Sequence, residues 1–213
     1  MKYDVIRRPK RRGVTLKVTK EGEIVVFAGL DVSDRRIAEF VEANSKWIER
    51  TTKRMFDLKK VKEELDDENY LTLHGVRYPV KYIFGEGKSF VGHEGVTVYY
   101  KESRSAARGE FFSEYAKDYL VRRFDELTKG VCPVKVKRVK GYFGIFHRDN
   151  GGMYIALNES IVHARKEVSD MIIYHELTHI GHAGHGRDFY EALSKLCPDH
   201  RALRKELNAT VKL

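Results

Sequence analysis

Apolar and polar residues alternate over short stretches of the first hundred residues. The stretches with this character are residues 14–18, 24–27, 70–73, 76–84 and 96–100. Alternation with period two is typical of strands that turn one face toward a core. Glu21-Gly22 supplies a turn between the first two stretches, and glycines separate the later ones. The pattern therefore predicts a front half that is rich in β-structure.

Helical spacing of apolar residues interrupts the front half once and dominates the back half. Ser33 is a predicted N-cap, and the apolar residues of 37–51 share one helix face, with Trp47 expected in the core. A second helix is predicted over residues 111–127, with Gly130 as its stop. Further back, the pattern predicts strands at residues 134–139 and 153–157, and helices from Ser169, over residues 187–196 and after Pro198.

These elements predict an α+β protein in two parts. A β-rich N-terminal region with one helix is expected over residues 1–103, and a largely helical domain over residues 104–213. With 213 residues, of which 42% are hydrophobic, the chain is long and apolar enough to build a core. No apolar run approaches the roughly 20 residues of a membrane-spanning helix, so we expect no membrane segment.

The number of cysteines and the composition of residues 1–5 indicate the cellular compartment. Cys132 and Cys197 are the only cysteines and lie far apart in the sequence. This spacing excludes a disulfide scaffold and an all-cysteine zinc site. Residues 1–5 lack the long apolar stretch of a signal peptide. We therefore expect a cytoplasmic protein.

The chain is basic, with a formal net charge of +9. Residues 1–20 hold eight Lys and Arg against the single acidic residue Asp4, and a second basic run covers residues 135–140. Either run could bind the phosphate backbone of nucleic acid nonspecifically. Solvated strand faces on a basic protein explain the same charges more simply. Charge alone therefore suggests a partner but not a function.

Two histidines and a glutamate stand together in residues 175–179, His-Glu-Leu-Thr-His. On a helix, His175 and His179 leave the same face with Cβ atoms about 6 Å apart, so both rings reach one metal ion. Glu176 projects from an adjacent part of the helix, where its carboxylate is able to take a proton from water. The pattern predicts a catalytic metal centre with two histidine ligands and Glu176 as general base.

A catalytic zinc site needs a third protein ligand and one open position. His182 stays on the same helix stripe only if the helix continues, and the rise of the helix then carries it away. His185 returns to the pair if the helix breaks first, and Gly181, Gly184 and Gly186 make a break easy. We therefore expect His185 to be the third ligand, with His182 near the site or in solvent.

A simpler interpretation is a helix with packed histidines and an ordinary surface glutamate. The apolar residues around the pair, Ile172, Tyr174 and Leu177 among them, argue against it because they indicate that this face is partly buried. Buried histidines beside a carboxylate need a polar partner, and a metal ion supplies one. The metal interpretation is therefore favoured.

Residues 174–190, Tyr-His-Glu-Leu-Thr-His-Ile-Gly-His-Ala-Gly-His-Gly-Arg-Asp-Phe-Tyr, resemble the YgjP-like zinc metallopeptidase family. They are also similar to the related WLM and SprT-like metalloproteases. Residues 3–18, 33–48 and 71–78 fit the front half of the YgjP-like pattern. The resemblance implies that His175, His179 and His185 bind Zn²⁺ and that Glu176 is the catalytic base. It further implies a zincin-type metallopeptidase domain with a small sheet in residues 104–213, acting on a peptide or protein.

The chain departs from the family pattern ahead of the metal helix. YgjP-like members usually carry Trp-Gly-Ser-Cys where this chain has Phe-Gly-Ile-Phe at residues 143–146, although Ile-Ala-Leu-Asn at residues 155–158 keeps the following strand. If the Ser-Cys pair shapes the substrate cleft, the cleft differs here. For a group that stabilises a developing oxyanion, proximity in sequence suggests His147, Arg187 or Tyr190.

The leading hypothesis is a zinc-dependent hydrolase, most simply a metallopeptidase. One alternative keeps the metal and base but hydrolyses a phosphoanhydride in a nucleotide, which the basic surface would suit; no Walker-type glycine loop supports it. The other alternative is a nucleic-acid-associated protein whose zinc is structural. Glu176 next to His175 and the lack of an obvious fourth ligand argue against that second alternative.

Overall fold

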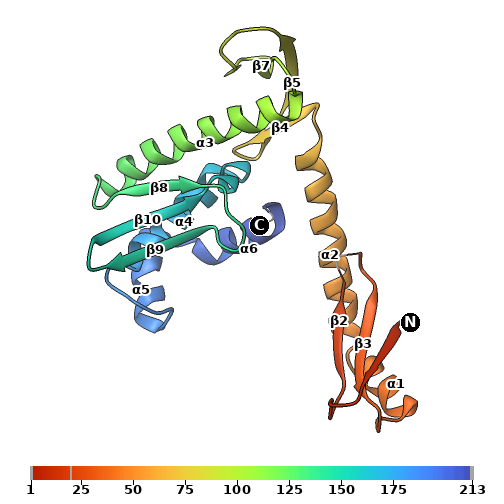
Figure 1. The fold of residues 1–213 in the computed structure, drawn as a ribbon. Coiled ribbons are helices and arrows are strands. Elements are labelled where there is room, and N and C mark those ends of the chain that lie inside the picture. The colour runs from red at the N-terminus through yellow and green to blue at the C-terminus, as the bar shows by residue number, and fades with distance from the viewer. Residues whose placement is uncertain (1, 20, 212–213) are drawn as a thin grey trace. The chain divides into compact units, whose positions relative to one another are not determined.

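The computed structural model describes residues 2–19 and 21–211 and confirms the α+β class (Figure 1). The chain divides into two compact units, Met1–Glu63 and Glu64–Leu213. Each unit has a hydrophobic core of its own. The predicted boundary after residue 103 falls within the second unit, just before a long helix, and stays a prediction about domains.

The first unit is a three-stranded sheet with helices. Its elements are β1 (Asp4–Arg8), β2 (Thr15–Val18), β3 (Ile24–Gly29), α1 (Asp34–Ala43) and most of α2 (Ser45–Asp66). The strand order is β1-β3-β2, with β1 parallel and β2 antiparallel to the central strand. Val26 and Ala28 of β3 are buried with Ile37, Val41 and Ile48 of the two helices.

The single helix predicted after Ser33 is two helices. Ser33 is the N-cap, and its hydroxyl accepts from the backbone N–H of Arg36 at 3.3 Å. Asn44 ends α1, since its Nδ2 donates to the carbonyl of Phe40 at 2.8 Å, and α2 begins at the next residue. The prediction that Trp47 is a core residue is wrong: it is 41% exposed, because the inward position on α2 belongs to Ile48.

The second unit begins with a four-stranded sheet and a long helix. The elements are β4 (Tyr70–Leu73), β5 (Val76–Phe84), β6 (Phe90–Val91), β7 (Val96–Tyr100) and α3 (Arg104–Thr128). The strand order is β4-β5-β7-β6. His74 and Gly75 both have positive φ, which gives the two-residue turn between β4 and β5. Phe112, Leu120 and Phe124 bury one face of α3, as its apolar spacing predicted.

A second sheet and three helices complete this unit and carry the residues of interest. The elements are β8 (Val134–Lys137), β9 (Gly144–Asp149), β10 (Gly152–Asn158), the 3-10 helix η1 (Glu159–His163), α4 (Lys166–Thr178), α5 (Arg187–Leu196) and α6 (His200–Thr210). The central strand β10 pairs in parallel with β8 and antiparallel with β9, so β9 is an edge strand. The sequence pattern did not predict β9, because its residues 147–149 are polar.

Helix α4 lies at the centre of the second unit. Its first turns bury Val168, Met171, Ile172 and Ile173, and it contacts β9, α5 and α6. The helix is therefore held by the core on several sides, and its C-terminal turn is fixed relative to the edge strand. No helix within the described part of the chain is both long and apolar enough to span a membrane.

Candidate active site

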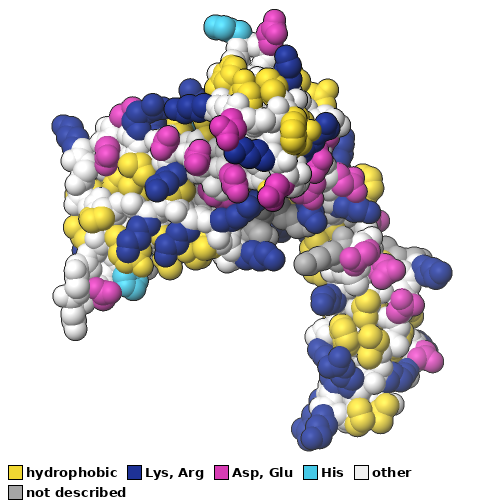
Figure 2. Space-filling view, turned by 45° about the horizontal axis from the view of Figure 1, so that its top comes forward, with side chains coloured by type: hydrophobic (Ala, Val, Ile, Leu, Met, Phe, Trp, Pro, Cys, Tyr) yellow, Lys and Arg dark blue, Asp and Glu magenta, His cyan; other side chains and the backbone are white. Residues whose placement is uncertain are grey.

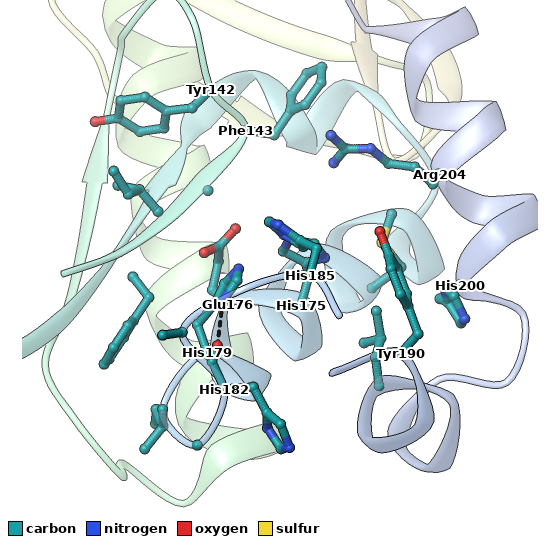
Figure 3. Close-up of a pocket in the computed structure, with 18 of the residues that line it drawn as sticks. Tyr142, Phe143, His175, Glu176, His179, His182, His185, Tyr190, His200 and Arg204 are labelled. Atoms are coloured by element: carbon teal, nitrogen blue, oxygen red, sulfur yellow. Dashed lines mark hydrogen bonds between the residues drawn. The ribbon is translucent and has the colours of Figure 1, made fainter. Parts of the chain in front are cut away.

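The last turn of α4 presents His175 and His179 side by side. Their ring centroids are 5.1 Å apart, as the spacing of four residues on a helix predicts. The helix ends at Thr178, so His179 is its C-cap residue and still has helical φ and ψ. Both side chains are half-buried, and the helix directs them into the same cavity (Figure 3).

The chain leaves the helix after His179 and brings His185 back to the pair. The Nε2 atoms of His185 and His175 lie 3.0 Å apart, and the ring centroids of His185 and His179 are 4.7 Å apart. Around Gly181, Gly184 and the other glycine of this loop, no heavy atom would meet an added Cβ within 4 Å. The loop therefore turns in open space, which permits the return of His185.

A buried phenylalanine of α5 supports all three imidazoles. Phe189 is 1% exposed, and its ring centroid lies 5.0 Å from that of His175, 4.6 Å from that of His179 and 4.8 Å from that of His185. An apolar ring at these distances limits how far the histidine rings can tilt. The sequence pattern gives no sign of this function of Phe189, because an apolar residue on a helix normally indicates a core position.

The three histidines fit a metal ion of the kind that imidazole prefers. One ring nitrogen of each histidine lies within 4.8 Å of the others. Tetrahedral ligands at about 2.0–2.1 Å from one Zn²⁺ lie roughly 3.3 Å apart, close to the 3.0 Å between the Nε2 atoms of His175 and His185. Burial lowers the pKa of His175 to about 4, so its ring is a neutral donor of electrons at physiological pH. These are the properties that a zinc ligand needs.

The backbone of residue 182 orients one of the candidate ligands. His179 donates from Nδ1 to the carbonyl oxygen of His182 at 2.9 Å, which leaves its Nε2 facing the other rings. The His182 ring points away from the three histidines in Figure 3, and its Nδ1 lies 3.3 Å from the Thr178 carbonyl oxygen. His182 thus contributes its main chain to the site.

Glu176 is a buried carboxylic group beside the histidines. It is 5% exposed, and burial raises its pKa to about 7 against the opposing effects of the Phe146 backbone N–H and the Arg204 charge. Gly144 at the start of β9 faces it: a Cβ at residue 144 would stand 2.7 Å from Cγ and Oε1 of Glu176. The edge strand thus supplies both a donor for the carboxyl group and the space that it occupies.

Asn158 at the end of β10 holds the segment that leads into β9. Its Nδ2 donates to the carbonyl oxygens of Val139 and Tyr142 at 2.7 and 2.9 Å, and its backbone N–H donates to that of Phe143 at 2.8 Å. Asn158 is 1% exposed, so these bonds are shielded from water. The departure from the family pattern at residues 143–146 lies in this segment, next to Glu176.

These groups open into one cavity of about 1030 Å³. Its wall is formed by β9 and the segment before it, by the end of α4 with the following loop, and by α5 and α6. The lining residues are Gly141 to Phe146, Arg148, Met171, His175, Glu176, His179 to Ala183, His185, Tyr190, Leu193, His200 and Arg204. A cavity of this size accommodates several residues of an extended peptide.

The sequence suggested three groups for oxyanion stabilisation, and one of them lines the cavity. Tyr190 lies there, stacked on His200 with ring centroids 5.8 Å apart. His147 is instead paired with Asp149 at 2.9 Å, and the exposed Arg187 with Glu191. Arg204 and His200, from α6, also line the cavity; no spacing in the sequence connects α6 with the histidine motif.

Comparison with known proteins gives one family match. The model of a family described as YgjP-like, metallopeptidase domain, matches residues 12–210. No curated protein matches the chain. The match includes β9, the histidine motif and α6, and it extends into the first unit.

Proposed function

Because the chain belongs to the YgjP-like metallopeptidase family, it is a metal-dependent hydrolase of the peptidase type, and we propose that it cleaves peptides with Zn²⁺ and Glu176. The observation that carries this proposal is the meeting of three imidazoles and one buried carboxyl group in a single cavity. The family resemblance stated from the sequence is confirmed, whereas the assignment of individual residues is our proposal.

His175, His179 and His185 would hold the ion. When bound, zinc supplies a Lewis acid that polarises the peptide carbonyl and lowers the pKa of water. The three rings are held in place by α4, by the carbonyl of His182 and by Phe189. Three protein ligands leave one position open, which catalysis requires and a structural zinc site does not.

Glu176 would move the proton. A carboxyl group with a pKa of about 7 is able to accept a proton from water and to return it to the leaving nitrogen near neutral pH. The Phe146 N–H bonds to the carboxyl group, and Gly144 leaves it room. Tyr190, with its ring stacked on His200, would place a hydroxyl near the developing oxyanion.

Replacing Glu176 with Gln tests the mechanism. We expect bound zinc to stay at one equivalent per chain while hydrolysis of a quenched fluorescent peptide library falls by at least about 10²-fold, since general base catalysis contributes that much. Glu167→Gln is a matched control, because Glu167 lies on the same helix and is exposed. A wild-type protein without zinc, or full activity in the Glu176→Gln variant, would refute the proposal.

A second candidate function has one observation in its favour. Arg148 and Arg204 line the cavity, and two cations beside a metal would also suit the phosphoanhydride of a nucleotide. Incubating the zinc-loaded protein with nucleoside triphosphates and with the peptide library separates the two reactions. Phosphate release without peptide cleavage would favour the second candidate.

We place the activity in the cytoplasm and expect peptides or proteins as substrates. The compartment rests on the two thiols, Cys132 and Cys197, which are both buried. The substrate class rests on the family.

A further inference from the structure

The charges that line the cavity are unbalanced. Among the described residues that line it, Glu176 is the only carboxylic group, whereas Arg148 and Arg204 are both cationic. Arg148 is partly engaged, since its Nη2 donates to the carbonyl oxygen of Ile180 at 3.0 Å. A cavity with this balance attracts a substrate that carries negative charge.

Arg204 differs from the arginines that link α3, α4 and α6, because those arginines bind carboxylates of the protein. Arg123 binds both carboxylate oxygens of Asp170 at 2.8 and 2.7 Å, and Arg165 binds both of Glu206 at 2.8 and 2.6 Å. Within residues 2–19 and 21–211, no ion pair or hydrogen bond of Arg204 is observed. Its guanidinium instead lies over the Phe143 ring, 5.8 Å from the centroid.

The position of Arg204 points its free donors at the site. Leu207, one turn further along α6, is buried, and Glu206 is tied to Arg165, so the helix that carries Arg204 is fixed. Figure 3 shows the side chain extending across the cavity between Phe143 and the Tyr190 and His185 rings.

A guanidinium is a planar fork of donors that matches the two oxygens of a carboxylate. We propose that Arg204 binds a carboxylate of the peptide substrate, and so makes this enzyme select peptides with a negative charge near the scissile bond. The inference rests on the proposed peptidase function and assigns the specificity of the same cavity. Two sources would present this group: the C-terminal carboxylate of a peptide, or the side chain of Asp or Glu within it.

Peptide binding to the zinc-loaded Glu176→Gln variant tests the inference without requiring turnover. Two pairs of fluorescent peptides are compared. The members of the first pair differ only at the C-terminus, which is a free carboxylate in one and an amide in the other. The members of the second pair have both ends blocked and differ only at one internal position, which is Glu in one and Gln in the other. Fluorescence anisotropy at low ionic strength gives the Kd of each peptide. We expect the carboxylate member of at least one pair to bind about tenfold more tightly, and the pair that discriminates identifies the source.

Adding Arg204→Gln to the Glu176→Gln background should reduce this preference to less than about twofold. Adding Lys205→Gln is the matched control, because Lys205 is an exposed cation of α6 that does not line the cavity, and it should leave the preference unchanged. Equal affinities within both pairs would overturn the inference. So would a preference that survives Arg204→Gln, which would assign the carboxylate to the metal or to Arg148, or one that Lys205→Gln also abolishes.

Hydrolysis of the same peptides by the chain that retains Glu176 separates this inference from the proposed function. Selective binding that depends on Arg204, without cleavage of any peptide, would support the inference and contradict the peptidase mechanism. Cleavage of all four peptides with equal kcat/KM would do the reverse.

Discussion

Gly144 and Glu176 are in such close contact that residue 144 has no space for a side chain. A Cβ there would stand 2.7 Å from both Cγ and Oε1 of Glu176, and 3.0 Å from Cδ. Gly144 belongs to the edge strand β9 and Glu176 to α4. The requirement for glycine is therefore one of space, imposed by the carboxyl group that we propose as the general base.

Replacing Gly144 with Ala should displace the carboxyl group of Glu176 rather than the strand, because a side-chain end yields more easily than a paired backbone. A displacement of about 1 Å typically costs about 10²-fold in rate. We expect kcat/KM to fall by that amount while the zinc content and the secondary structure measured by circular dichroism stay unchanged.

Gly13→Ala is the control for this substitution, since no heavy atom lies within 4 Å of the added Cβ and φ is not positive there. It should leave kcat/KM within about twofold of the original value. An active Gly144→Ala variant would show that the position of Glu176 next to β9 does not matter for the reaction.

His185 and His182 should differ in their effect on metal affinity. His185→Ala removes an imidazole whose Nε2 lies 3.0 Å from that of His175, so zinc affinity should fall by more than about 100-fold. His182→Ala keeps the main-chain carbonyl that accepts from His179, so affinity should change by less than about threefold. Competition with a zinc chelator measures both, and equal losses would contradict the assignment of His185.

Asn158→Ala should weaken both the fold and the reaction. The substitution leaves the carbonyl oxygens of Val139 and Tyr142 without their donor in a buried place, which costs about 2–3 kcal/mol. The segment before Gly144 loses its anchor, so kcat/KM should fall as well. Urea unfolding and peptide hydrolysis measure the two effects. Asn208→Ala, at an exposed position of α6, is the control and should change neither quantity.

Acid should destabilise the fold through a histidine outside the metal site. Burial, with a smaller effect of Lys166, lowers the pKa of His74 from 6.5 to about 4. Between pH 6.5 and about pH 4, His74 therefore binds a proton in the unfolded chain but not in the folded chain. The free energy of unfolding is highest above pH 6.5 and falls as the pH is lowered toward 4. After a discount for partial exposure the loss is about 1–2 kcal/mol.

Urea unfolding with a chelator present, at about pH 7.5 and about pH 4.5, measures this loss without interference from metal binding. His74→Asn suits the test, because Asn tolerates the positive φ of residue 74. We expect the variant to lose less stability than the unaltered chain over the same interval. An identical loss would assign the acid sensitivity elsewhere, for example to His163, whose pKa burial also lowers.

Nonspecific binding of nucleic acid by the first unit stays a prediction from charge. In the space-filling view, Lys and Arg side chains are spread over the surface among acidic and apolar ones (Figure 2). Arg8 and Arg11 lie over the ring of Phe27, with their guanidinium carbons 5.2 and 5.5 Å from its centroid. If both contact phosphates, replacing both with Gln should make the slope of log K against log salt shallower by about 1.8. No DNA binding at low salt, or an unchanged slope, would show that these arginines belong only to a solvated face.

Local spacing explains what could be predicted from the sequence at the site. The interval of four residues predicted the proximity of His175 and His179, and the glycines after them predicted the return of His185. The ends of helices were harder to predict. The apolar spacing continues from α1 into α2, but α1 ends at Asn44, whose side chain donates a hydrogen bond to the carbonyl of Phe40. Periodicity carries no information about such a bond.

Long-range pairing explains what the sequence could not supply. Arg204 reaches the cavity because α6 packs on α4, and Asn158 acts through a register of β8, β9 and β10 that only the folded sheet defines. No motif in the sequence singles out Gly144. The need for glycine there follows only from the close contact with the side chain of Glu176 in the folded chain.

Because α4 ends at Thr178, two of the proposed ligands are held by the end of a helix and the third by a loop. Two of the histidines follow a helix that the core holds, whereas His185 stands at the far side of a loop whose glycines have open space around them. An ion in this centre would leave when the loop opens, with the helix intact. We therefore expect the residence time of the metal to be adjustable through this loop, and a Gly184→Ala variant that slows loop opening to retain its metal longer against a chelator.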